Sequence, residues 1–140
     1  MVMNKLGIVW GCVVLLLLAS CGKDGEEESE RFRLLTGVTW ASDSLLVNGE
    51  GAGSPGQMLA DFRGEARFRE DGTGTFGVYE GRWEFAAAET EIIIQSEALS
   101  IPLTTRIAEL TAASLKVTTA FPNPEVPDEP FMIRMTFKAK

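Results

Sequence analysis

Apolar side chains recur at every second position in much of this 140-residue chain. The last such segment is the clearest, because Phe131, Ile133, Met135 and Phe137 fall on one face and only Met132 breaks the pattern. Successive side chains of a strand point to opposite faces, so this period indicates strands with one buried face. Alternation or β-branched runs predict strands at 38–47, 63–69, 73–79, 80–85, 91–96, 101–110, 114–121 and 131–138.

Turn signals separate these strands. Asp71-Gly72 lies between two alternating segments and predicts a hairpin. The following strand, 73–79, is expected to place Phe76 and Val78 on the same face. The glycines of 48–56 predict a long loop without a regular element, and four prolines in 122–130 exclude that stretch from a sheet.

The pattern predicts an all-β fold, an antiparallel up-and-down β-barrel of about eight strands over residues 33–140. Short connections and the lack of a helix long enough for a crossover favour antiparallel neighbours. Closing the meander into a barrel removes exposed edges, which favours a barrel over an open sandwich. Residues 30–35 are expected to form a short helix before the first strand.

The first 20 residues are predicted to be a lipoprotein signal peptide. Lys5 precedes an almost wholly apolar stretch, and Leu18-Ala19-Ser20-Cys21 follows the lipobox pattern. The stretch from Leu6 to Ser20 is shorter than the ~20 residues that a membrane-spanning helix needs. We therefore expect cleavage before Cys21, lipidation of its thiol with fatty-acyl chains such as palmitate, and attachment to a membrane through this lipid.

Residues 21–32 are predicted to be the lipidated cysteine and an acidic tether. The run from Gly22 to Glu30 has no apolar residue, and its charge favours a solvated, extended chain. Acidic runs directly after the lipidated cysteine resemble the surface-export signals of Bacteroidota lipoproteins. We expect anchoring to the outer membrane in the cell envelope, with the periplasmic face and the cell surface both open.

Residue types exclude several chemistries from the predicted domain. The chain has no His, and its two cysteines, Cys12 and Cys21, both precede the domain. The usual zinc ligand sets, a histidine-based triad and a cysteine nucleophile are therefore excluded. A formal charge of −7 without a basic stripe argues against nucleic acid. We expect no catalytic residues, no metal and no cofactor; a hydrolase or isomerase is the least favoured class.

Three motifs resemble the lipocalin-like lipoprotein domains of Bacteroidota. They are the stretch from Leu34 to Trp40, the stretch from Phe68 to Phe76 that leads to Gly81-Arg-Trp83, and the stretch 106–115. The likeness covers roughly residues 33–138 and implies a lipocalin-like barrel in which Trp40 closes one end. Lipocalins themselves usually begin with Gly-x-Trp, so the spacing here favours the lipocalin-like group. The motifs are structural, and none of them is catalytic.

The aromatic residues of the predicted strands are the candidate binding residues. They either fill the interior, as in many small barrels, or line a cavity for a small hydrophobic ligand. The candidate ligand-binding set is Trp40, Phe68, Phe76, Trp83, Phe85, Phe131 and Phe137. We expect an envelope protein that binds a small apolar ligand or envelope component; the alternative is an interaction or structural module with a filled barrel. A cavity of roughly 300 Å³ or more would favour the first.

Overall fold

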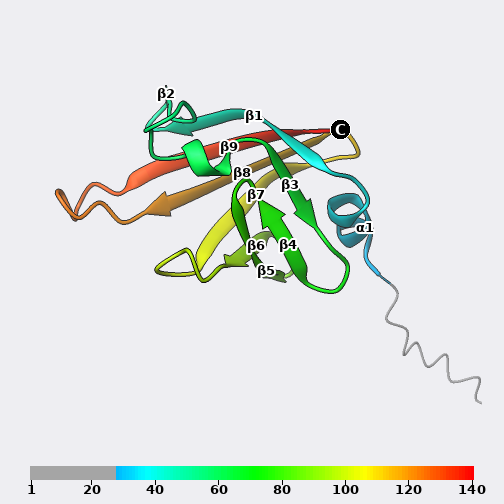
Figure 1. Cartoon of the computed structure of the whole chain (residues 1–140). Coiled ribbons are helices and arrows are strands. Elements are labelled where there is room, and N and C mark those ends of the chain that lie inside the picture. Colours follow the sequence, from blue (N-terminus) through cyan, green and yellow to red (C-terminus); the bar gives the residue numbers. More distant parts are fainter. Residues whose placement is uncertain (1–27) are drawn as a thin grey trace, which may run out of the picture.

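The computed structural model describes residues 28–140. The predicted signal peptide, Cys21 and most of the acidic tether lie outside the described residues. Figure 1 shows the elements. They are helix α1 (Glu30–Thr36), the 3₁₀ helix η1 (Ala60–Phe62), and strands β1 (Trp40–Val47), β2 (Glu50–Gly51), β3 (Glu65–Phe68), β4 (Thr73–Phe76), β5 (Tyr79–Ala86), β6 (Glu91–Gln95), β7 (Leu103–Leu110), β8 (Ser114–Phe121) and β9 (Phe131–Ala139).

Eight strands close into an antiparallel up-and-down β-barrel, as predicted. From β3 to β9 each strand pairs with the next one in the chain, and β1 pairs with both β3 and β9. The first and last strands are therefore neighbours, so the sheet has no long free edge. β2 has only two residues and extends β1 as a small hairpin within the loop predicted to be irregular.

The alternating pattern points its apolar members into the barrel. In β9, Ile133, Met135 and Phe137 are buried, whereas Met132 lies on the outer face with 56% of its surface exposed. Burial of the inward side chains from all eight strands produces one continuous core. The expected orientation of β9 is confirmed.

Helix α1 closes one end of the barrel. The Ser29 hydroxyl caps the helix by accepting a hydrogen bond from the Phe32 N–H at 3.0 Å. The Phe32 ring packs against Trp83, with centroids 5.8 Å apart. The Trp40 indole N–H donates to the Leu35 carbonyl at 3.0 Å, and both residues are fully buried. The helix therefore belongs to the core, and it crosses the expected boundary between tether and domain at residue 33.

The hairpin predicted at Asp71-Gly72 joins β3 and β4. Gly72 has φ +86°, a conformation that glycine adopts without strain. One Asp71 carboxylate oxygen accepts hydrogen bonds from the Thr73 hydroxyl at 2.6 Å and from the Thr73 N–H at 2.9 Å. These two bonds stabilise the ionised carboxyl and hold the pKa of Asp71 below its ordinary value.

The expectation that Val78 shares the inward face of Phe76 is wrong. β4 ends at Phe76, and Gly77 turns the chain with φ +62°. Val78 lies in this turn and has 69% of its surface exposed. A tight turn ends the alternation before Val78 and directs its side chain to solvent.

The barrel is splayed between β1 and β3 at the end opposite α1. Only Trp40 and Ala41 of β1 pair with β3. Beyond this point the chain between β2 and β3 covers the interior, and Leu59 inserts with 2% of its surface exposed. This end is formed by segments 48–62, 77–80, 96–102 and 121–131, which we call the open-end segments (Figure 1).

Candidate functional site: an apolar pocket at the open end

Four of the seven candidate aromatics pack together in the half of the barrel next to α1. Trp83 lies at the centre, with Phe68 at 5.6 Å and Phe85 at 5.3 Å, both edge-on. Phe76 contacts Phe68 at 5.2 Å. The Trp83 indole N–H donates to the Arg69 carbonyl at 2.9 Å, so its polar group is satisfied. This arrangement is a packed aromatic core.

The other three candidates are Trp40, Phe137 and Phe131. Trp40 and Phe137 are buried, and Phe131 is partly buried at the open end, paired with Phe121 across β8 and β9. Only about 20 Å³ remains free among Phe68, Phe76, Phe137 and their neighbours. That volume is about the space of one water molecule, so this half of the barrel is filled.

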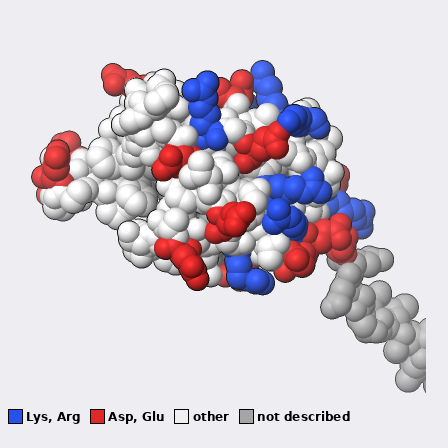
Figure 2. Space-filling view, viewed as in Figure 1, with Lys and Arg blue, Asp and Glu red and all other residues white. Residues whose placement is uncertain are grey.

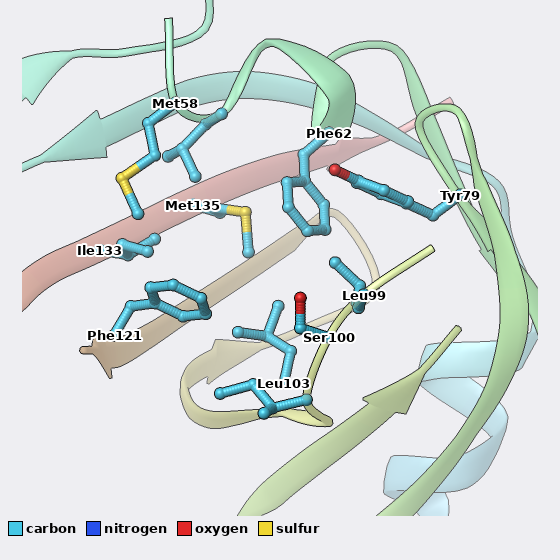
Figure 3. A pocket seen from close by; sticks show the side chains of 11 residues that line it. Met58, Phe62, Tyr79, Leu99, Ser100, Leu103, Phe121, Ile133 and Met135 are labelled. Atoms are coloured by element: carbon cyan, nitrogen blue, oxygen red, sulfur yellow. The ribbon is translucent and has the colours of Figure 1, made fainter. Parts of the chain in front are cut away.

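A larger cavity of about 180 Å³ opens at the other end of the barrel (Figure 3). The open-end segments supply most of its lining, and inward residues of β7 and β9 supply the rest. The lining residues are Met58, Leu59, Phe62, Tyr79, Leu99, Ser100, Ile101, Leu103, Phe121, Ile133 and Met135. We call this cavity the open-end pocket. None of the seven candidate aromatics lines it.

The chain between β2 and β3 forms one wall of the open-end pocket. Phe62 packs on Tyr79, with ring centroids 4.9 Å apart, and both rings face the cavity (Figure 3). Met58 and Ile101 stand at the mouth with 43% and 46% of their surfaces exposed. The pocket therefore opens to solvent between two exposed apolar side chains.

Few polar groups face the open-end pocket. Ser100 and the Tyr79 hydroxyl are the lining residues with side-chain oxygens. The Tyr79 hydroxyl donates to the Asp61 carboxylate at 3.4 Å. Burial raises the pKa of the Tyr79 phenol, and the negative charge of Asp61 raises it further. The phenol is therefore neutral at pH 7 and serves as a hydrogen-bonding group.

The size of the open-end pocket decides which ligands it can hold. Its 180 Å³ is below the roughly 300 Å³ at which drug-sized ligands are enclosed. An engineered apolar cavity of about 150 Å³ in another protein binds benzene. The pocket therefore matches a single small ring or a short alkyl chain. Among residues 28–140, no group of three or more metal-ligating side chains lies close enough together to hold a metal ion.

The pocket residues fall into two classes with respect to the sequence. Leu103, Ile133 and Met135 lie on strands, and their alternation identifies them as inward-facing. Met58, Leu99 and Ile101 lie on loops, where no periodic pattern indicates which way a side chain points. An apolar residue among the glycines and serines of a loop was the one signal available for this second class.

No helix within residues 28–140 is both long enough and apolar enough to pass through a membrane. No protein-family model matches this chain, and no curated protein matches its sequence significantly. Shape, lining and charge are therefore the observations on which the function of the open-end pocket can be judged.

Proposed function

We propose that this protein is a lipid-anchored, non-enzymatic envelope protein that binds a small apolar ligand, or a small apolar group of an envelope component, in the open-end pocket. The observation that carries the proposal is an apolar cavity of about 180 Å³ that is open to solvent at the mouth of a closed barrel. A β-barrel is compatible with a lipocalin-like ligand-binding fold. The resemblance to the lipocalin-like lipoproteins of Bacteroidota supports the same proposal.

The position of α1 bears on how the pocket would be presented. The described chain begins beside α1, at the end of the barrel opposite the open-end pocket (Figure 1). A protein held to the outer membrane through Cys21 would be attached at this closed end. The mouth would then face away from the bilayer, which favours ligands that arrive from solution.

The packed half of the barrel favours the second candidate, a filled interaction or structural module. Only about 20 Å³ is free around Phe68, Phe76 and Phe137, and the open-end pocket is smaller than a drug-sized site. In that case the apolar side chains at the mouth would contact another protein. Titration with a small alcohol distinguishes the two candidates.

We expect 1-hexanol to bind in the open-end pocket. Burying six carbons at about 0.8 kcal/mol each gives a gross gain of about 5 kcal/mol, equivalent to a dissociation constant of about 0.2 mM. Association costs reduce this gain, so we expect a dissociation constant in the millimolar range. In a detergent-free NMR titration of methionine methyl groups, Met58 and Met135 should shift because they line the pocket. Met132 lies on the outer face and serves as an internal reference.

A pair of tryptophan variants tests the location. Ile101→Trp should weaken hexanol binding at least tenfold, because the larger side chain occupies the mouth. Met132→Trp adds the same ring at an exposed position away from the pocket and should leave the affinity near that of the parent protein. Equal shifts of all three methionines, or no effect of Ile101→Trp, would favour the filled module.

The lipid anchor is tested separately. We expect Cys21→Ala to abolish incorporation of labelled palmitate into the protein, because the thiol that accepts the lipid is lost. Cys12→Ala is the matched control and should retain full labelling, since Cys12 lies inside the apolar leader. Equal labelling of the two variants would contradict lipidation at Cys21.

A further inference from the structure

The charged residues within the open-end segments are all of one sign. The open-end segments contain no Lys or Arg. Their acidic residues, all exposed, are Glu50, Asp61, Glu80, Glu97, Glu125, Asp128 and Glu129, which we call the acidic rim. In Figure 2, the end of the molecule on the left, where the β8–β9 connection projects, has red atoms and no blue ones. Arg63 directly follows the first open-end segment and borders its 51–57 stretch. The other basic residues of the described chain lie on the strands, in the β3–β4 hairpin, on α1 or at the C-terminus.

The carboxylates of the acidic rim are not neutralised by ion pairs within the described chain. The three ion pairs among residues 28–140 join Lys116 to Glu109, Lys138 to Asp43, and Lys140 to Glu65. None of them includes a rim carboxylate. Asp61 is the rim residue tied most directly to the pocket, because its carboxylate accepts the hydrogen bond from the Tyr79 hydroxyl.

This distribution of charge creates a negative potential over an apolar opening. A mouth lined by charges of one sign raises the local concentration of ligands of the opposite sign and repels those of the same sign. An alkyl chain seated in the open-end pocket would leave its polar head at the end of the barrel that carries the acidic rim, where Asp61 contacts the lining residue Tyr79. A positive head would be attracted there, whereas a carboxylate or phosphate head would be repelled.

We propose that the open-end pocket selects small apolar molecules that carry a positive charge, such as short-chain alkyl ammonium ions, over neutral and anionic ones. This inference rests on the proposed function, because it assumes that the pocket holds the apolar part of the ligand. It excludes short fatty acids as preferred ligands. Burial of the alkyl chain in the apolar cavity provides the binding free energy, and the acidic rim discriminates between ligands by the charge of their head groups.

Three ligands with the same chain and different heads test the preference. Hexylammonium, 1-hexanol and hexanoate are positive, neutral and negative at pH 7, and each can be titrated against the purified protein by methionine methyl NMR. At low ionic strength we expect affinity to fall in that order, with hexylammonium at least tenfold tighter than hexanoate. At about 1 M salt, where the Debye length is about 3 Å, the ratio should approach one.

Two charge variants locate the source of the preference. Neutralising three rim carboxylates with Glu80→Gln, Glu97→Gln and Glu125→Gln should lower the ratio of hexylammonium to hexanoate affinity several-fold. The matched control neutralises three carboxylates elsewhere with Glu30→Gln, Glu70→Gln and Glu91→Gln. It changes the net charge equally and should largely retain the ratio.

The outcomes separate the two proposals. If none of the three ligands shifts Met58 and Met135, the proposed function fails and the charge preference fails with it. If hexanol binds and hexanoate binds as tightly as hexylammonium at low salt, the ligand-binding function stands and the charge preference is overturned. A preference that both triple variants reduce equally would also overturn it, because net charge would then be the cause.

Discussion

Replacing Trp40 with Ala should lower the free energy of unfolding by about 3–5 kcal/mol, the usual cost of removing a buried aromatic side chain. Trp40 is fully buried and its indole N–H donates to the Leu35 carbonyl at 3.0 Å. The substitution leaves a cavity at the closed end and removes the contact that holds α1 to the barrel. For a domain of about 110 residues, the melting temperature should fall by on the order of 20 °C.

Urea unfolding followed by far-ultraviolet circular dichroism measures this loss. Trp40→Phe keeps an aromatic ring and removes the hydrogen bond, so it should cost less, about 1–3 kcal/mol. Met132→Ala is the control, because its exposed side chain on β9 contributes little to the core. If Trp40→Ala were no more destabilising than Met132→Ala, Trp40 would not close the barrel as described.

The second large effect is expected at Gly77, and Gly77→Ala should cost about 2–5 kcal/mol. Gly77 has φ +62°, where a residue with a Cβ is strained by about 1–2 kcal/mol. Its Cβ would also overlap the carbonyl oxygen of Asp61 and crowd the Phe62 backbone, so the two segments must separate. That separation would move Phe62 and widen the wall of the open-end pocket.

Gly56→Ala isolates the conformational part of this cost. Gly56 has a similar φ of +84°, but a Cβ there would have nothing within 4 Å. It should destabilise the protein by only about 1–2 kcal/mol. The methyl resonance of Met58 should shift in Gly77→Ala because the pocket wall moves. Equal unfolding free energies for the two variants would show that the overlap at Gly77 relaxes without cost.

Local patterns in the sequence were sufficient to predict the strands and the hairpin at Asp71-Gly72. Period-two alternation identifies the inward face of β9, because successive side chains of a strand point to opposite faces. The same rule failed at Val78, since Gly77 ends the strand and a turn has no periodic side-chain direction. The number of strands and their antiparallel order also follow from local signals.

The binding candidates show where sequence reasoning stops. Aromatic residues on strands are the most visible apolar groups in the sequence, but the structure packs Phe68, Phe76, Trp83 and Phe85 against one another. The free volume lies instead among smaller aliphatic side chains and loop residues such as Met58 and Ile101. A cavity is the space left after all side chains have packed, so no single segment indicates its place.

By itself, the sequence determined where apolar and polar side chains alternate and where the chain turns. It also determined that the open-end segments have acidic residues and no basic ones. The tertiary structure decided the register in which β1 pairs with β9, that the barrel is splayed beside β3, and that one apolar pocket opens among these segments. Alternation and turns depend on neighbouring residues, whereas strand register and residual volume depend on contacts between distant ones. The residues of the acidic rim are far apart in the sequence, and only folding brings them to the end of the barrel where the pocket opens.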